Sequence, residues 1–600
     1  MPHIKLGESI PPDTAHAVSV SLPTWRDNVG YEEGEKLVLD SMTTGYPRFF
    51  IHKSIQAFAQ DIAQGHGLPG QQAMLFPTRS TAQRCMAFIK EKAPASAQEH
   101  LSAVHLVLDY SNSAAAPLRP INPTISAVLF KPETFSYAKQ YWQHSGDGVS
   151  SRRAEFCHGL YTQGLLVLDD SHKPPMSPVR QVPGKGPRRY QRVMSTDDTA
   201  FNSSPRFGQT NGAAPDSEES SRFVEERFGR NLDISLVERA KVAIKRRIAG
   251  TLTTDVDVGN HPLPQVEPSN RGVHGLSEQD IYLYPMGMNA IFNMHRLLLS
   301  SRGSYKSISF GFPYVDTLKI LEKFGPGCVH YGRASEGDLD DLEQRLKSGE
   351  KFLGLFCEFP GNPMLTCPNL QRLRKLADQY DFAVVVDETI GTFANINVLQ
   401  YADVVVSSLT KIFSGDCNVM GGAAVFNPSS RYYSLLKEAA AQDYEDTYWP
   451  EDVIFLERNS RDFMTRIDRI NTNAEAICEV LLANPRVKTV HYPKHNPDRA
   501  NYDACKLPGA GYGGLLSVVF HKKVDAMAFY DSIETAKGPS LGTNFTLTSP
   551  YVVLAHYAEL DWVASLGVDP DLIRISVGLE ETEELVEVFQ SALRAADKAS

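Results

Sequence analysis

From about residue 222 onward, short apolar runs alternate with segments in which apolar residues recur at helical spacing. This alternation predicts an α/β domain whose largely parallel sheet is covered by helices on both faces. Each candidate strand is nearly continuous in apolar residues, as expected for a strand that is buried on both sides. The clearest candidates lie at residues 281–284, 352–356, 382–386 and 404–406.

A second, smaller α+β region is predicted beyond this sheet. A long helix near residues 453–483 opens it, because apolar residues from Phe463 to Leu481 recur in alternating steps of four and three. Strands near 489–492 and 515–520 follow, and a helix ends the chain. The region therefore has the mixed pattern of a small C-terminal domain.

The first 170 residues mix strand-like and helical patterns. Apolar runs typical of strands lie at 105–109, 125–130 and 164–168, and a helical pattern lies near 51–62. These patterns predict an additional N-terminal α+β region, to which they assign no function.

The next segment differs in composition, because it is rich in Pro, Ser, Gly, Arg and Asp and has few large apolar side chains. Such a segment cannot bury a core, and it predicts a disordered linker. Its basic stretch at 180–192 suits acidic partners, but a solvated linker is the favoured interpretation. We therefore predict four units: an extension at 1–170, a linker at 171–221, a large domain with an N-terminal arm at 222–435, and a small domain at 436–600.

Composition and charge narrow the functional class. The chain has 600 residues, of which 42% are hydrophobic and 22% charged, a balance typical of globular proteins. A net charge of −11 argues against a general nucleic-acid binder. No apolar run approaches the roughly 18 residues of a membrane helix, and residues 1–11 lack the apolar core of a signal peptide. We expect a cytoplasmic protein without membrane partners, and a nuclear location is also compatible.

The eight cysteines are scattered and show no paired CxxC spacing. This pattern supports neither a disulfide framework nor a zinc site. We therefore expect free thiols and no metal.

Two polar residues follow neighbouring apolar runs. Asp387 comes directly after residues 382–386, and Lys411 follows the run at 404–406. Alone, Asp387 is more often a turn residue and Lys411 an exposed one. Adjacent parallel strands would bring both to one edge of the sheet, where α/β proteins bind ligands. Pyridoxal phosphate (PLP) needs such a pair, because a lysine amine forms an imine with its aldehyde and a carboxylate keeps its ring nitrogen protonated.

A phosphate-binding turn is also predicted. Residues 284–290 join a strand to a helix, where Gly287 lets the backbone approach a ligand and the helix N-terminus offers free N–H groups. Considered alone, this segment is equally an ordinary strand–turn–helix. With Asp387 and Lys411, it predicts a phosphate contact at Gly287 and Met288, joined by the hydroxyls of Ser408 and Thr410.

Together these residues resemble the signature of the Cys/Met-metabolism enzymes, a family of fold-type-I PLP-dependent transferases. The resemblance covers about 222–598 and includes Glu358–Leu365, the stretch from Asn473 to Pro493, Ser540–Gly542 and Arg574–Glu580. It implies that Lys411 holds the cofactor and is catalytic, and that Asp387 contacts the ring nitrogen.

The resemblance implies further roles. Tyr314 would stack on the cofactor ring, and Asn362 would contact its phenolic oxygen and the substrate. Arg574 would grip the substrate α-carboxylate with its two-pronged donor geometry, and Ser540 would also contact the substrate.

The family's Tyr-x-Arg pair reaches the phosphate bound by the neighbouring subunit. Phe228–Asn231 lies where the family has that pair, so Arg230 would bind phosphate and implies a homodimer or homotetramer. Phe228 replaces the tyrosine there and removes its hydroxyl. Other departures from the family pattern are Glu388 after Asp387, Asp416 after Gly415, and Phe545 where lyase-like members often carry Glu.

Within the family, the chain most closely resembles the fungal-type cystathionine γ-synthases, whose long N-terminal extension begins with a segment similar to residues 17–31. This resemblance implies a trans-sulfuration enzyme of methionine biosynthesis. It would join L-cysteine to an O-acyl-L-homoserine, with acetyl as the expected acyl group, and release L-cystathionine. Three alternatives stay open: a cystathionine lyase, an O-acetylhomoserine sulfhydrylase, and a non-catalytic scaffold with the same fold.

Overall fold

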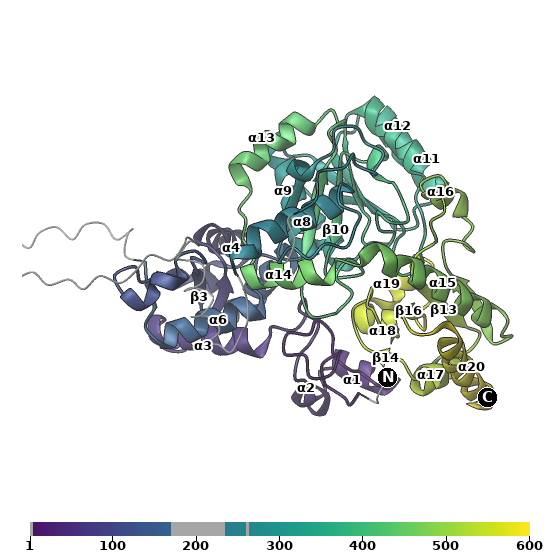
Figure 1. Cartoon of the computed structure of the whole chain (residues 1–600), viewed down its shortest axis with the longest axis horizontal. Coiled ribbons are helices and arrows are strands. Elements are labelled where there is room, and N and C mark those ends of the chain that lie inside the picture. The colour runs from purple at the N-terminus through teal and green to yellow at the C-terminus, as the bar shows by residue number, and fades with distance from the viewer. Residues whose placement is uncertain (1–3, 170–233, 260–262, 600) are drawn as a thin grey trace, which may run out of the picture.

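The computed structural model describes residues 4–169, 234–259 and 263–599, and the expected linker at 171–221 lies outside these residues. Figure 1 shows an N-terminal α+β part beside a central α/β part, with a smaller C-terminal α+β part on another side. Among the described helices, none is long and apolar enough to cross a membrane.

The central sheet has seven strands in the order β5-β11-β10-β9-β8-β6-β7. All neighbours from β10 to β7 are parallel, and β11 runs antiparallel to both β5 and β10. The predicted α/β fold class with its largely parallel sheet is confirmed. In sheet order, the strands span Ile281–Tyr284, Gly422–Phe426, Val404–Ser408, Ala383–Asp387, Phe352–Glu358, Lys306–Phe310 and Cys328–Tyr331.

Both faces of this sheet are buried because alternate strand residues point to opposite sides. On β9, Val384 and Val386 pack into one core, and Ala383 and Val385 pack into another. This double burial explains the continuous apolar runs in the sequence. The first core is covered by α8 (Val237–Ala249), α11 (Glu336–Lys347) and α12 (Leu370–Tyr380), and the second by α9 (Gly287–Arg302), α10 (Val315–Lys323) and α13 (Tyr433–Asp443).

The C-terminal part is built on a five-stranded sheet in the order β12-β13-β16-β15-β14. Helices α15, α17 and α20 cover it, and the shorter α18 and α19 lie toward the central part. The strands span Val487–His491, Leu515–Phe520, Ile573–Ser576, Leu547–Ser549 and Ala536–Lys537, and the helices span Phe463–Leu482, Lys523–Ser532, Thr582–Ala599, Tyr551–His556 and Leu560–Ser565.

The single helix predicted near 453–483 is wrong, because the chain forms α14 (Pro450–Asn459) and then α15, with a break at 460–462. Arg466 on α15 bridges the break. Its guanidinium donates to the carbonyl of Asn459 at the end of α14 and to the carbonyls of Ile412 and Phe413. In a continuous helix, the Asn459 carbonyl would accept a hydrogen bond from the helix backbone. At the break it accepts from Arg466 instead, and the same guanidinium binds the loop that follows Lys411.

The N-terminal part has an antiparallel sheet in the order β1-β3-β2-β4, whose strands span Gln72–Phe76, Ile125–Phe130, Ser102–Leu108 and Leu166–Leu168. One face packs on α3 (Lys53–His66) and α6 (Ser151–Thr162). The other face packs on α4 (Arg79–Lys92) and α5 (Phe135–Ser145), and this core continues without interruption into α9 and α10 of the central part. Phe88 of α4 stacks on Phe324 at a ring distance of 4.9 Å. The N-terminal part is therefore joined to the central part by a hydrophobic core.

This shared core makes a prediction about stability. Phe88→Ala should lower the free energy of unfolding by about 3 kcal/mol, because it removes a buried ring and leaves a cavity. The loss should appear in the transition that also unfolds the central part, measured by denaturant unfolding with a probe in each part. Leu37→Ala, at a side chain that is 80% exposed, is the control and should change little. A separate N-terminal transition that alone shifts in Phe88→Ala would contradict the shared core.

Candidate active site

A cavity lies where the central sheet, the C-terminal part and an N-terminal segment meet. The carboxyl ends of β9 and β10 and the start of α9 form its floor. Every predicted site residue within the described ranges lines it, and Arg230 lies outside those ranges. These residues are Gly287, Met288, Tyr314, Asn362, Asp387, Ser408, Thr410, Lys411, Ser540 and Arg574.

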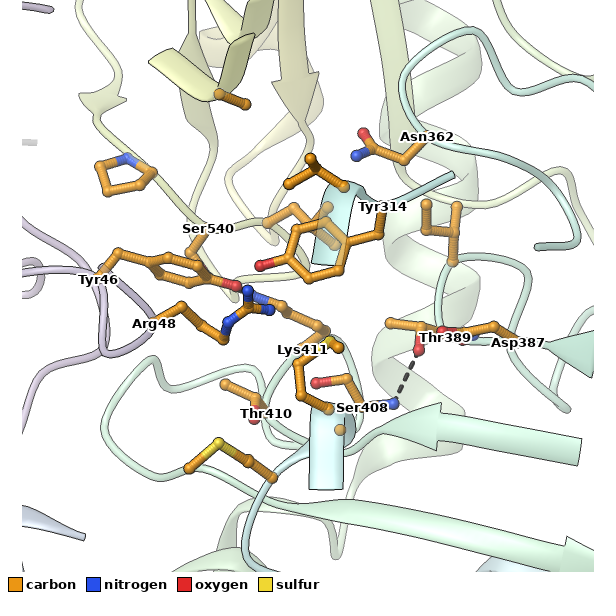
Figure 2. A pocket seen from close by; sticks show the side chains of 18 of the residues that line it. Tyr46, Arg48, Tyr314, Asn362, Asp387, Thr389, Ser408, Thr410, Lys411 and Ser540 are labelled. Carbon is orange, nitrogen blue, oxygen red and sulfur yellow. Dashed lines mark hydrogen bonds between the residues drawn. The ribbon is translucent and has the colours of Figure 1, made fainter. Parts of the chain in front are cut away.

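Asp387 is placed by strand pairing. Strands β9 and β10 are parallel neighbours, with Val406 opposite Asp387. The carboxylate accepts a 2.9 Å hydrogen bond from the Thr389 backbone, and the Thr389 hydroxyl accepts one of 2.8 Å from the Ser408 backbone (Figure 2). Burial raises the pKa of Asp387, and no cation among the described residues forms an ion pair with it. The site thus presents a half-buried carboxylate to a ligand that carries a charged N–H group.

Lys411 follows β10 and is only 8% exposed. Its Nζ atom lies 3.0 Å from the Tyr46 hydroxyl and 3.0 Å from the Ser540 hydroxyl. Burial lowers the pKa of Lys411 to about 8, and the charges of Arg574 and Arg48 act in the same direction. A substantial fraction of this amine is therefore neutral, and so nucleophilic, near physiological pH.

A tight loop from the C-terminal part encloses the amine. Gly542 has a φ of +68°, and a Cβ atom there would lie 2.5 Å from the Ile412 backbone nitrogen. Ser540 also has a positive φ, +91°, which is strained for a residue with a side chain. Arg574 holds this conformation by donating a 2.6 Å hydrogen bond to the Ser540 carbonyl. The strain is therefore offset by contacts that place the Ser540 hydroxyl against the amine of Lys411.

Arg574 lies on β16 and is buried. It donates to Asn362 Oδ1 at 3.1 Å, and its guanidinium lies 4.4 Å from the centre of the Tyr551 ring. Burial lowers the pKa of Arg574, and no carboxylate among the described residues forms an ion pair with it. A buried guanidinium that has only neutral partners is suited to bind an anionic ligand.

At the predicted phosphate-binding turn, the backbone lies as expected. The side chains of Thr410 and Met288 make other contacts. A Cβ atom on Gly287 would lie 2.6 Å from the Ser408 Cβ, so only glycine allows β10 to pack against the start of α9. The Thr410 hydroxyl exchanges hydrogen bonds with the Gly421 backbone, and the Met288 side chain packs into the core. Helix α9 therefore offers backbone N–H groups here, joined by the Ser408 hydroxyl.

Glu358 is a cavity residue to which sequence reasoning gave no role. Its two carboxylate oxygens accept hydrogen bonds from the backbone of Tyr314, at 2.5 Å, and of Asn362, at 3.1 Å. Burial, and to a smaller extent the charge of Asp387, raises the pKa of Glu358 to about 8. Its position in the Glu-x-Pro-x-Asn-Pro segment was the available signal. Glu358 ties together the two loops that carry Tyr314 and Asn362.

Sequence reasoning also missed Tyr46 and Arg48, which enter the cavity from the N-terminal segment (Figure 2). The available signal was their Tyr-x-Arg spacing, with the tyrosine that Phe228 lacks. Arg48 is 6% exposed, pairs with Asp316, and lies 4.7 Å from the centre of the Tyr314 ring. Within the described structure, its Nε and Nη1 atoms are buried without hydrogen-bond partners. Two unsatisfied donors in a cavity are suited to an anion such as a phosphate.

Three departures from the family pattern, Glu388, Asp416 and Phe545, lie outside the cavity lining, and Phe228 lies outside the described residues. Glu388 forms a buried ion pair with Arg271, whose Nη2 atom donates to both carboxylate oxygens, at 2.7 and 2.9 Å. Asp416 accepts a hydrogen bond from Asn544, and Phe545 packs with Val18 and other apolar residues of the N-terminal segment. These three substitutions therefore change the surroundings of the site and leave its lining unaltered.

The lining residues fit PLP. The cofactor needs an amine for its aldehyde, a carboxylate for its ring nitrogen and an anion cradle for its phosphate. Lys411, Asp387, and the start of α9 with Arg48 provide these three groups around one cavity. Among the described residues, no cluster of three or more His, Cys, Asp or Glu side chains forms a metal site.

Comparison with known proteins agrees with this chemistry. Residues 276–594 match the family model described as Cys/Met metabolism PLP-dependent enzyme, and residues 54–150 match that of the fungal trans-sulfuration enzyme N-terminal domain. The chain is 61% identical to a cystathionine gamma-synthase of Neurospora crassa, over 100% of both chains. It is 38% identical to a cystathionine gamma-synthase of Saccharomyces cerevisiae, over 98% of this chain and 99% of that one. An alanine racemase of Aspergillus violaceofuscus is 32% identical, over 99% of this chain and 97% of that one.

The pKa of Lys411 makes a prediction for the cofactor-free protein. Only the neutral amine attacks an aldehyde, so the rate of PLP capture should rise with pH and level off above about 8. An unburied lysine, with a pKa near 10.5, would instead give a rate that still rises between pH 8 and 10. Stopped-flow absorbance measures the rate, and Lys411→Ala is the control that should show no capture. A midpoint near 10 would contradict the buried site.

Proposed function

The chain belongs to the Cys/Met metabolism PLP-dependent enzyme family, and we propose that within it the enzyme joins L-cysteine to an O-acyl-L-homoserine to form L-cystathionine. The observation that carries this proposal is identity of 61% over the full length of a cystathionine gamma-synthase. It is combined with a cavity whose lining provides an amine, a carboxylate and anion-binding groups for PLP. The acyl group is proposed to be acetyl, on the resemblance to the fungal-type enzymes.

PLP, when bound, supplies an electron sink for the charge that develops at the substrate α-carbon. The Lys411 amine is placed to remove and return the α-proton, because it is the buried base at the centre of the cavity. The Ser540 and Tyr46 hydroxyls hold that amine from two sides and so restrict its direction. Asp387 would hold the proton on the ring nitrogen of bound PLP.

The substrate is oriented by the opposite wall. Arg574 binds the α-carboxylate, which fixes the substrate relative to Lys411, and such positioning lowers a barrier by several kcal/mol. Asn362 is held by Arg574 and by Glu358, so it presents its amide in one direction. Tyr551, whose ring lies against Arg574, is buried and lines the same wall.

The alternatives use the same cavity. A cystathionine lyase would cleave the product instead of forming it, and a sulfhydrylase would accept sulfide in place of cysteine. Phe545 lies outside the cavity lining, so it gives no argument against the lyase. The full-length identity to cystathionine gamma-synthases favours synthesis. A non-catalytic scaffold is disfavoured by the buried amine and its partners.

Assembly and location are part of the proposal. A homodimer or homotetramer in the cytoplasm is proposed on the family resemblance. The Tyr-x-Arg pair that lines the cavity is Tyr46 and Arg48 of the same chain, so we propose that this pair, and not Arg230, contacts the phosphate. Light scattering of the purified enzyme measures the assembly state.

Product analysis tests the reaction. The holoenzyme with O-acetyl-L-homoserine and L-cysteine should form cystathionine, and Lys411→Ala should form none, because it lacks both the cofactor attachment and the base. Sulfide in place of cysteine, and cystathionine alone, are the two comparison reactions. Faster turnover with sulfide would favour the sulfhydrylase, and breakdown of cystathionine without its synthesis would favour the lyase.

Arg574→Lys tests the carboxylate contact. The variant should raise KM for the homoserine ester by about 10- to 100-fold with a smaller change in kcat, because a lysine cannot form the two-pronged pair with a carboxylate. Steady-state kinetics measures both constants. Arg333→Lys, at an exposed arginine that donates to the Ser565 carbonyl, is the matched control. An unchanged KM in Arg574→Lys would remove Arg574 from the substrate site.

A further inference from the structure

The end of helix α5 in the N-terminal part contacts Asp316, the ion-pair partner of the cavity residue Arg48, through His144. The His144 side chain is 7% exposed, and its Nδ1 atom lies 2.8 Å from Asp316 Oδ1. Lys323 donates to its Nε2 atom at 3.2 Å, which leaves Nδ1 as the nitrogen that carries a proton. His144 is thus a hydrogen-bond donor to Asp316, two residues after the ring of Tyr314.

Asp316 connects His144 to the cavity. Its carboxylate is 1% exposed, accepts a second hydrogen bond from Gln143 of α5, at 3.2 Å, and pairs with Arg48. A carboxylate buried this deeply is stable only if its partners are fixed. Two donors on α5 therefore determine where the counter-charge of Arg48 lies. Because Arg48 pairs with Asp316 through Nη2, its Nε and Nη1 atoms are left to donate to a ligand.

A second contact reaches the start of α9. Asn289 in its first turn donates to the Ser145 carbonyl, at 3.1 Å, and to Asp147 Oδ1, at 2.8 Å. Gly146 has a φ of +65°, and a Cβ atom there would lie 2.8 Å from the Asn289 backbone nitrogen. The loop at 145–147 therefore packs directly against the first turn of α9, which begins at Gly287.

The Asp147 carboxylate is in turn held within the N-terminal part. It accepts hydrogen bonds from the Tyr141 hydroxyl, at 2.5 Å, and from Arg84 Nε, at 3.1 Å. Tyr141 also packs against Phe292 of α9 in the shared core. The loop is thus a rigid support, because its one buried charge is fully paired.

We propose that the N-terminal part is a built-in clamp on the phosphate end of the cavity, with His144 and Asp147 as its positioning residues. His144 fixes the position of Arg48 through Asp316, and Asp147 fixes the position of the first turn of α9 through Asn289. The two contacts act on the two groups that can bind a phosphate, and neither touches Lys411 or Asp387. The clamp therefore contributes mainly to binding of the phosphate, and it acts on the ring and aldehyde contacts only indirectly, through Arg48. The inference rests on PLP binding and is independent of which reaction follows.

The test compares PLP with pyridoxal, which lacks the phosphate, in titrations of the cofactor-free full-length protein followed by absorbance. His144→Phe should weaken PLP binding by about 10-fold, the loss of about one hydrogen bond to a charged group. Pyridoxal binding should stay within about twofold. His144→Asn, whose amide can replace the Nδ1 donor, should restore most of the PLP affinity. His158→Phe, at a histidine of α6 that contacts Asp61, is the matched control.

Asp147→Asn is the second variant and should show the same selective loss through the other contact. The phosphorus NMR signal of bound PLP should shift in both variants. Equal losses for PLP and pyridoxal would show that His144 only supports the fold, and unchanged PLP binding would remove the clamp altogether. Cystathionine formation by the unaltered enzyme is measured separately, so failure of the proposed reaction is distinguishable from failure of the clamp.

Discussion

The Lys411 amine can react near neutral pH only while it is kept from bulk water, because burial is what lowers its pKa. No single domain of this chain encloses it. The central sheet places the lysine, the strained loop at Ser540 covers it from the C-terminal part, and Tyr46 closes it from the N-terminal segment. The reactivity of one amine therefore depends on the packing of three parts of the chain.

The acidic and basic side chains of the cavity lie apart from one another, as a cofactor with a protonated ring nitrogen and a phosphate requires. Asp387 lies at the floor without an ion-pair partner among the described residues, and Arg574 and Arg48 lie on other walls. Arg48 is paired with Asp316, whereas Asp387 and Arg574 have no ion-pair partner among the described residues, which makes their burial costly. Neutral hydrogen bonds from Thr389 and to Asn362 and Ser540 reduce that cost and leave the charge available to a ligand. The cavity is therefore preorganised for an anionic, aromatic ligand and an amino acid.

The N-terminal part is bound to this arrangement by a core and by two polar contacts. Phe88 and Tyr141 share a core with α9 and α10, the helices that begin beside Gly287 and Tyr314. Packed interiors transmit small displacements, because they are as dense as organic crystals. A part of the chain that lies outside the cofactor domain is thus mechanically coupled to the cofactor site through the N-terminal ends of two helices.

The sequence by itself determined four strands of the central sheet and the edge at which the site forms. A strand buried on both faces must be a continuous apolar run, so β5, β8, β9 and β10 were visible, and Asp387 and Lys411 followed from their ends. The family motifs located Asn362, Ser540 and Arg574. Only the tertiary structure decided that Tyr46 meets Lys411 across 365 residues, and that α14 and α15 separate so that Arg466 can reach the Lys411 loop. The reason is physical: a local pattern records that a residue is buried, but which distant surface buries it depends on how the whole chain packs.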